Sequence, residues 1–244
     1  MLKNNLNVVI ISLAMVISAY LFSNAFQNRN KSSDTISVTG LGKKDFTSDL
    51  IVWNGSFSKK STTLKEAYAN LDSDREKIRT YLSGKGIKSG EMVFSAVNFN
   101  KDFETIFNQN GTTRQQIFTG FTLTQNVSIQ SKEVNKIEEI SRQSTELINS
   151  GVEFYSNAPE YYYTKLAELK IQMIAEATKD ASTRAKSIAE NADANLGHLK
   201  KSDMGVFQII GQNSSEDYSY GGSFNTSSKN KTATITVKLV YQVD

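Results

Sequence analysis

Residues 164–192, TKLAELKIQMIAEATKDASTRAKSIAENA, decide the fold. Their apolar positions recur in alternating steps of three and four residues, which predicts one long helix. We expect its buried stripe to consist of Ala167, Ile171, Ile174, Ala181, Ala185, Ile188 and Ala192, with Thr178 in the remaining slot and Ala175 and Ala189 beside it. Because alanine is small, this alanine-rich helix can lie close to the surface on which it packs, which we expect to be a sheet.

Strand patterns lie on both sides of this helix. Alternation or β-rich composition predicts strands over residues 35–39, 46–58, 91–99, 114–129, 152–155, 206–210 and 232–243. Residues 91–99 and 114–129 form a predicted hairpin, with Asn110-Gly111 as its turn. Pro159, the only proline, marks a turn before Tyr161.

Two further helices are predicted before the long one. A capping box, Thr63 to Glu66, opens the first, and Gly84 and Gly86 end it. Its apolar face is expected to comprise Leu64, Ala67, Tyr68, Leu71, Ile78 and Leu82. The second is expected to be capped by Ser131, to bury Val134, Ile137, Ile140, Leu147 and Ile148, and to end at Gly151.

The order of these elements predicts an α+β fold. Strands flank each helix and hairpins join them, which favours antiparallel-rich sheets packed with three helices in repeated strand–helix–strand hairpin units. A doubly wound parallel sheet would instead alternate single strands with helices.

Residues 6–26, LNVVIISLAMVISAYLFSNAF, carry no charge and predict a fourth, N-terminal helix. A helix of this length spans roughly 30 Å, which is enough to cross a bilayer as an uncleaved anchor. Ser23-Asn24-Ala25 also has the small-x-small pattern of a signal-peptidase site, so a cleaved signal is an alternative, and a buried core helix is a third. The predicted organisation is a membrane or signal segment at 1–26, a polar tether at 27–34 and one folded domain at 35–244.

Composition excludes several classes of function. The 28 basic and 25 acidic residues are spread along the chain without a basic block, which argues against nucleic-acid binding. No cysteine is present, so disulfides, thiolate metal sites and cysteine nucleophiles are excluded. We predict no cofactor.

Three short patterns are weak candidates for sites. Gly40-Leu-Gly42 follows a strand, but a third glycine and a helix are missing, so we interpret it as a turn rather than a phosphate site. Asp72, Asp74 and Glu76 resemble the start of a calcium loop, but they fall within a predicted helix, where a solvated face is expected. His198, the only histidine, lacks the pattern of a metal site or catalytic triad and is expected at a surface or strand edge.

The polar segment 211–231 is the candidate partner contact. Tyr218, Tyr220 and Phe224 lie there among glycine, serine and asparagine, a composition suited to adaptable contacts. The alternative is a flexible hairpin extension. The run Tyr161 to Tyr163 also offers a surface to a neighbouring subunit, although packing in the core or at an edge strand is the simpler interpretation.

Several short motifs occur in a characteristic order along the chain: Ile36-Ser-Val-Thr-Gly40, Asp180-Ala181, Arg184-Ala185-Lys186, Ala189, Leu196-Gly197 and the terminal strand Val237 to Tyr241. Through these motifs the chain resembles the SIMPL-domain family over roughly residues 35–243. The resemblance implies an exported bacterial protein of the periplasm or outer envelope, with relatives that form channel-like oligomers or are associated with oxidative or envelope stress. The family has no catalytic motif to transfer. The apparent anchor and the long segment 211–231 depart from its commonest pattern.

We therefore expect a non-enzymatic interaction protein. It would be anchored through residues 6–26 in the cytoplasmic membrane, with a domain in the periplasm that self-associates as a homo-oligomeric scaffold. The alternative is a periplasmic small-molecule-binding module. A hydrolase built on paired carboxylates is a third hypothesis, for which the sequence favours no particular pair.

Overall fold

The computed structural model describes residues 2–31, 34–107, 114–217 and 219–243. Four α-helices occur in these residues, α1 (Leu2–Lys31), α2 (Leu64–Gly84), α3 (Val134–Gln143) and α4 (Leu166–Asn191), together with 3₁₀ turns at Ser89–Glu91 and Ser144–Ser150. The strands are β1 (Thr35–Thr47), β2 (Leu50–Ser61), β3 (Met92–Phe94), β4 (Asn98–Phe107), β5 (Arg114–Ser131), β6 (Phe154–Ser156), β7 (Glu160–Tyr162), β8 (Leu196–Met204), β9 (Gln208–Gly211) and β10 (Asn230–Val243). The predicted α+β class is confirmed.

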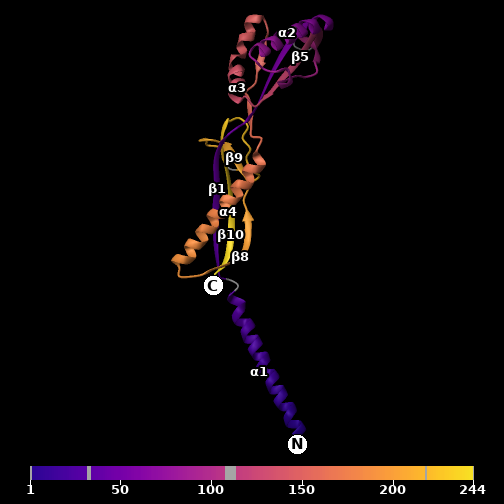
Figure 1. Cartoon of the computed structure of the whole chain (residues 1–244). Coiled ribbons are helices and arrows are strands. Elements are labelled where there is room, and N and C mark those ends of the chain that lie inside the picture. The colour runs from indigo at the N-terminus through magenta and orange to yellow at the C-terminus, as the bar shows by residue number, and fades with distance from the viewer. Residues whose placement is uncertain (1, 32–33, 108–113, 218, 244) are drawn as a thin grey trace.

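The domain consists of two halves arranged end to end (Figure 1). One sheet has the order β1-β10-β8, with β9 also paired to β10, and it carries α4. The other has the order β3-β5-β2-β6, with β4 on β5 and β7 on β2, and it carries α2 and α3. All these strand pairs are antiparallel. The second half is an insertion, because residues 50–162 lie between β1 and α4 of the first.

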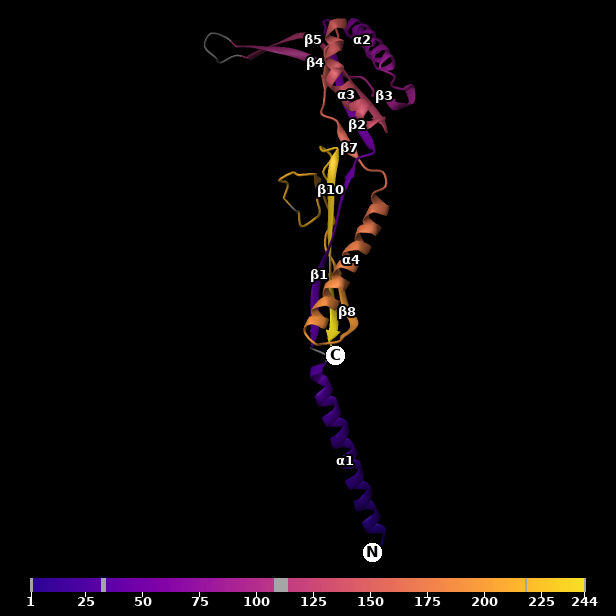
Figure 2. The same ribbon diagram turned by 60° about the vertical axis from the view of Figure 1, so that its left-hand side comes forward.

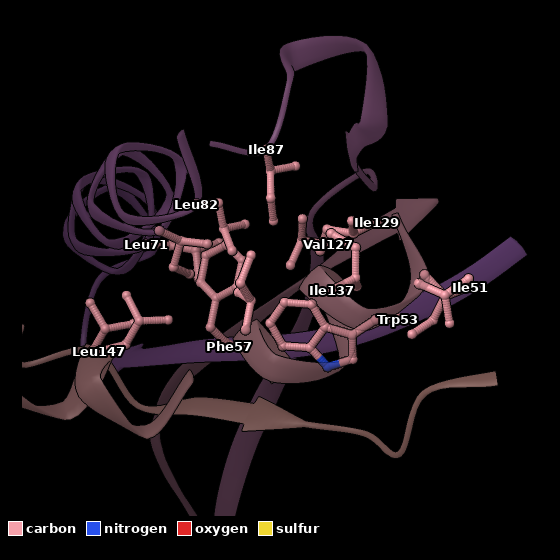
Figure 3. Close-up of a cluster of buried hydrophobic side chains, with 14 of the residues drawn as sticks. Ile51, Trp53, Phe57, Leu71, Leu82, Ile87, Val127, Ile129, Ile137 and Leu147 are labelled. Atoms are coloured by element: carbon pink, nitrogen blue, oxygen red, sulfur yellow. The ribbon is translucent and has the colours of Figure 1, made fainter. Parts of the chain in front are cut away.

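The inserted half has its own hydrophobic core (Figure 3). On β2, every second residue faces inward, so that Ile51, Trp53 and Phe57 are fully buried. Side chains from α2, α3 and β5 close over them, among them Leu71, Leu82, Val127, Ile129 and Ile137. The Trp53 indole N–H is satisfied by the Ser156 hydroxyl at 3.0 Å.

Helix α4 crosses the first sheet on a row of small residues. The buried residues are Leu169, Met173, Ala177, Ala181, Ala185 and Ala189, which follow one another in steps of four. The predicted stripe was therefore right at Ala181, Ala185 and Ala189. It was wrong at Ile171 and Ile188, which are 70% and 49% exposed, and at the exposed Ala167, Ala175, Thr178 and Ala192. The face of α4 that is buried is the face that contacts β1. The periodicity of hydrophobic residues along the helix does not show which face that is.

The interpretation of Gly40-Leu-Gly42 as a turn was wrong. These residues continue β1 without a break, and β1 pairs with β10 from Thr35 to Thr47. A Cβ atom on Gly40 would lie 2.1 Å from the Ala177 carbonyl oxygen, and one on Gly42 would lie 2.5 Å from the Met173 carbonyl oxygen. The glycines are present because α4 touches the strand there. Strand β8 was not predicted, because LGHLKKSDM has no apolar alternation.

Helices α2 and α3 follow the prediction with three corrections. The Thr63 hydroxyl accepts the Glu66 N–H at 3.3 Å, but the Glu66 carboxylate accepts from the Ser61 hydroxyl instead of completing a capping box. Ser131 does not cap α3, which begins after Glu133, and Gly151 ends the following 3₁₀ turn with φ 73° as predicted. Leu64, Tyr68 and Ile148 are exposed rather than buried.

Helix α1 extends away from the two sheets (Figure 1). Its apolar window Val9–Phe26 is long enough to cross a membrane, and none of it is buried against the rest of the described chain. A core helix would be buried, and the interpretation of residues 6–26 as a buried core helix is therefore wrong. The helix continues to Lys31, beyond the predicted start of the tether.

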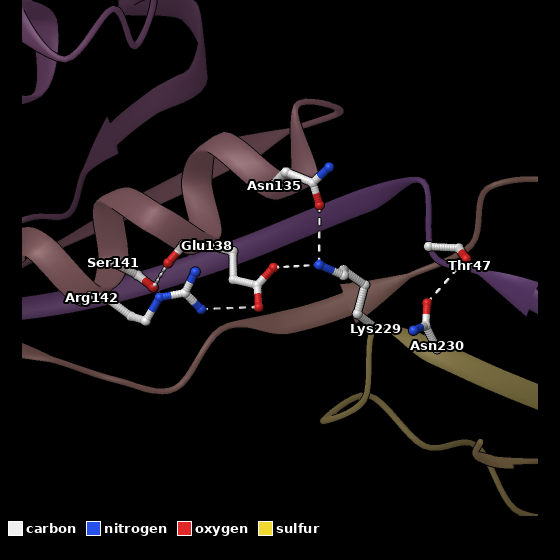
Figure 4. Close-up of polar contacts among 7 residues, drawn as sticks. All are labelled: Thr47, Asn135, Glu138, Ser141, Arg142, Lys229 and Asn230. Atoms are coloured by element: carbon white, nitrogen blue, oxygen red, sulfur yellow. Dashed lines mark hydrogen bonds and ion pairs between the residues drawn. The ribbon is translucent and has the colours of Figure 1, made fainter. Parts of the chain in front are cut away.

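Hydrogen bonds and an ion pair join the two halves (Figure 4). Lys229, just before β10, donates to Glu138 at 2.6 Å and to Asn135 at 3.1 Å, both on α3. The Lys229 ammonium is the main reason why the pKa of the Glu138 carboxyl lies below its usual value. Also where the two halves meet, Asp49 accepts from the N–H and the hydroxyl of Thr164, each at 2.7 Å.

Candidate functional site

The β4–β5 hairpin forms an arm that projects sideways from the inserted half (Figure 2). The two strands pair from Asn98–Thr124 outward to Phe107–Arg114, with a register shift between Asp102 and Phe103. At this shift Thr119 has no partner in the ladder, as in a β-bulge, which bends a strand and increases its twist.

One face of the arm is aromatic. Phe103 lies opposite Phe118 in the register, and their ring centroids are 5.8 Å apart in an edge-to-face arrangement. Phe118 also contacts Phe121, with centroids 5.1 Å apart. Phe103 is 53% exposed and Phe118 44% exposed. The rings therefore stack on one another and leave much of their surface in water.

The aromatic face continues into an apolar groove at the base of the arm. Phe99 of β4 and Leu123 of β5 are directly opposite one another and lie on the same face as Phe103. The groove has a volume of about 580 Å³ and is lined by Leu64, Lys65, Tyr68, Val97, Phe99 and Leu123. Leu64 and Tyr68, which helical periodicity assigned to the core, instead form the wall that α2 contributes.

A second hollow lies on the face of the first sheet opposite α4. It has a volume of about 880 Å³, and its lining includes Leu41, Lys43, Thr234, Thr236 and Tyr220. The described residues 212–217 and 219–229 form its outer edge. The amide of Gln208 holds this segment, since it donates to the Ser219 carbonyl at 2.6 Å and accepts from the Ser219 N–H at 3.4 Å.

The comparisons with known proteins assign a family. The model of the family described as "SIMPL: Protein of unknown function (DUF541)" matches residues 36–241, which is nearly the whole of both sheets. The chain belongs to the SIMPL family. The resemblance inferred from the motifs is thereby confirmed, and the matched SIMPL domain includes the arm, the groove and the second hollow.

Outside the family, the comparisons add little to this SIMPL domain. No curated protein matches the sequence. The solved structure of a GlnK–ATP complex from B. subtilis is 10% identical and has a TM-score of 0.27, covering 44% of this chain and 83% of the GlnK chain. A likeness at this level carries no argument about fold or function.

The residues that the sequence singled out are not gathered on the arm of the SIMPL domain. Tyr220 is fully exposed at the rim of the second hollow. Phe224 is half-exposed and forms an isolated bridge with Ile209 of β9, while Tyr218 lies outside the described residues. Tyr161 is buried, and Tyr163 packs on Phe46 with ring centroids 4.8 Å apart. Core packing, the simpler interpretation of that tyrosine run, is correct at these two positions.

The titratable candidates have structural surroundings. Asp74 is buried and lies 3.0 Å from the Lys59 ammonium and 3.6 Å from that of Lys77, so the predicted solvated face was wrong at this position. His198 lies exposed on β8. No group of three or more His, Asp or Glu side chains that could hold a metal ion occurs in the described part of the chain.

Lys231 is a buried charged residue of the SIMPL domain. Its side chain is almost fully buried where the two halves meet. The ammonium donates to the carbonyl oxygens of Tyr161 at 2.9 Å and Asn225 at 2.6 Å. Desolvation lowers the pKa of Lys231 to about 8, and the Glu216 carboxylate opposes part of that shift. The buried lysine thus links Asn225, in the segment before β10, to Tyr161 of the inserted half.

Sequence reasoning predicted a hairpin here, whose turn at Asn110-Gly111 lies outside the described residues, but it missed the outer half of β4 and the aromatic face of the arm, although a signal for them was present. Phe99, Phe103 and Phe107 recur every fourth residue, which places them on one face of a strand. The intervening residues Asn100 to Glu104 are polar or charged except for Phe103, so the predicted strand was ended at Phe99. Only the pairing with β5 brings Phe118 next to these rings.

Proposed function

We propose that this chain is a non-enzymatic scaffold protein that self-associates on the outer side of the cytoplasmic membrane, in the periplasm, with α1 as its membrane anchor. The observation that carries this proposal is the laterally projecting arm with its exposed aromatic face. A surface of this kind is typical of protein contacts, because soluble monomers rarely expose contiguous apolar patches of more than a few hundred Å².

The energetics of the arm favour a partner. A half-exposed aromatic ring that becomes covered removes roughly 100 Å² from water, which corresponds to about 2.5 kcal/mol. Phe103 and Phe118 together therefore supply a driving force that folding of the monomer leaves unused. Rigid aromatic side chains also lose little conformational entropy on binding, which is why they dominate interaction hot spots.

The position of the arm supports self-association of anchored copies. Thr35, the first residue of the sheets after α1, pairs with Gln242, so the chain enters and leaves at the same end of the first half. The arm belongs to the inserted half at the opposite end and projects across the long axis (Figure 2). Copies anchored in one membrane would therefore present their arms at the same height above it.

The test is the mass of the full chain in lipid nanodiscs or detergent, measured by light scattering across a range of concentrations. We expect a discrete oligomer that Phe103→Ser and Phe118→Ser together convert to smaller species. Ile188→Ser, which removes an exposed apolar side chain from α4, is the matched control and should leave the mass unchanged. A wild-type chain that is monomeric at every concentration would contradict the proposal.

A second candidate function is the binding of a small envelope molecule in the hollow beside Tyr220. Its volume lies in the range of small-molecule sites, and it combines apolar and hydroxyl-bearing side chains. Thr234→Met should fill the hollow and abolish any rise in Tm that a library of small molecules produces with the wild type. If no compound in the library raises the Tm of the wild type, small-molecule binding is contradicted and the scaffold function is the one that remains.

A further inference from the structure

We infer that the arm of one copy docks in the groove at the base of the arm of a second copy, with Phe103 and Phe118 covering Leu64, Tyr68 and Phe99. This inference rests on the proposed self-association and names the surface that receives the arm. It assigns a binding role to the face of α2 that helical periodicity had placed in the core.

The arm cannot fill its own groove. Phe99 forms part of the groove, and Phe103 lies four residues further along the same strand. From Phe103 to Phe107, β4 pairs with β5 without a further register shift, and the arm that the two strands form projects sideways from the inserted half (Figure 2). An arm that reaches this groove must therefore come from another molecule.

The groove suits the side chains that the arm offers. Five of its six lining residues are apolar or aromatic, and its volume of about 580 Å³ lies within the range of sites that bury small ligands. Its floor, Leu123, is buried and belongs to the core of the inserted half. Rings that enter the groove would thus extend this core.

The position of the anchor favours a second copy over a lipid surface. Arm and groove both belong to the inserted half. In two parallel anchored copies, the arm of one copy therefore lies at the height of the groove of the other, and neither copy needs to tilt. The aromatic face is separated from α1 by the first sheet, in which β1 alone has 13 residues and spans roughly 40 Å. The bilayer that holds α1 therefore lies beyond the reach of these rings.

Disulfide trapping tests the contact directly, because the chain has no cysteine of its own. Full-length Phe103→Cys and Tyr68→Cys chains, carrying tags of different size, are reconstituted together in vesicles and oxidised. We expect a mixed disulfide dimer between the two variants. Phe103→Cys paired with Tyr155→Cys, an exposed aromatic position on β6, is the matched control and should give little product.

The other outcomes separate this inference from the function on which it rests. A Phe103→Cys disulfide with itself as the main product would mean that arms meet arms, which overturns docking in the groove but keeps self-association. An oligomer by light scattering with no trapped dimer would overturn the docking in the same way. A monomer in both measurements would contradict both proposals.

A substitution in the groove gives a second measurement. Tyr68 is half-exposed and contributes to no core, so Tyr68→Ser should leave the fold intact. We expect the dissociation constant of the oligomer to rise on the order of tenfold, as with Phe103→Ser. The double variant should lose less than the sum of the two changes, because both remove one contact. An unchanged dissociation constant for Tyr68→Ser would exclude the groove.

Discussion

The Asp180 carboxylate of α4 accepts the backbone N–H of Leu41 on β1 at 2.9 Å, and the same oxygen accepts from the Arg184 side chain at 2.9 Å. Leu41 lies between Gly40 and Gly42, where helix and strand are closest. The glycines remove the side chains that would separate the two elements, and Asp180 satisfies a donor at the free edge of β1. An edge strand whose donors are satisfied in this way is less available for pairing with another chain.

Gly40→Ala should destabilise the domain. The added Cβ would lie 2.1 Å from the Ala177 carbonyl oxygen and 2.4 Å from the Ala181 nitrogen, both backbone atoms that cannot turn aside. We expect a loss of about 2–4 kcal/mol in urea unfolding because α4 must move off the sheet. Gly84→Ala is the control, since a Cβ there meets no atom within 4 Å. Equal stability of the two variants would mean that helix and strand are not in close contact.

Asp180→Ala should release the amide of Leu41. The bond from Leu41 is the main reason why the pKa of Asp180 is lowered, with Arg184 contributing next. A carboxyl whose folded pKa is lowered stabilises the fold above its unfolded value and loses that contribution as the pH falls through the folded pKa. Hydrogen exchange at Leu41 should therefore accelerate in the variant, and in the wild type at acidic pH. Glu190→Ala, at an exposed position on the same helix, should leave the exchange unchanged.

Lys231 should make stability rise with pH in the alkaline range. Its folded pKa of about 8 lies below its ordinary value of 10.5, so the unfolded chain binds more protons between these values. The free energy of unfolding should increase from pH 8 upward, by at most roughly 3 kcal/mol. Tyrosine ionisation opposes the trend above pH about 10, because burial or hydrogen bonding raises the pKa of Tyr81, Tyr161 and Tyr162.

Lys231→Met should abolish this slope. Lys238→Met, which changes an exposed lysine of the same strand, should retain it. Urea unfolding at several pH values from 7.5 to 9.5 measures both variants. A slope that survives in Lys231→Met would assign the alkaline stabilisation to another group.

The outer part of the arm should open locally. Around Ile117 and Phe118, β5 pairs only with β4, whereas around Val127 and Ile129 it pairs with β2 on one side and β3 on the other and lies in the core. Hydrogen exchange at low protein concentration should be at least about tenfold faster in the outer part. Raising the concentration should slow it as the arm becomes covered. Equal protection of both parts at low concentration would contradict an unsupported arm.

The sequence by itself determined most of the local structure. The capping hydroxyl of Thr63, the alternation along β2 and β10, and the long apolar run in α1 are all local signals, because each depends on neighbouring residues and a fixed period. The family resemblance was likewise legible in short motifs whose order the fold preserves. These features predicted the α+β class and the alanine-rich helix that packs on a sheet.

Which face each element buries was decided by the tertiary structure. Gly40-Leu-Gly42 has the composition of a turn, yet the approach of α4 requires glycine within a strand. Leu64 and Tyr68 have the spacing of core residues, yet α2 turns them toward the base of the arm. The physical reason is the same in each instance: burial depends on which distant segment lies opposite, and the contacts of α4 with β1 and of β4 with β5 join residues whose pairing no local period encodes.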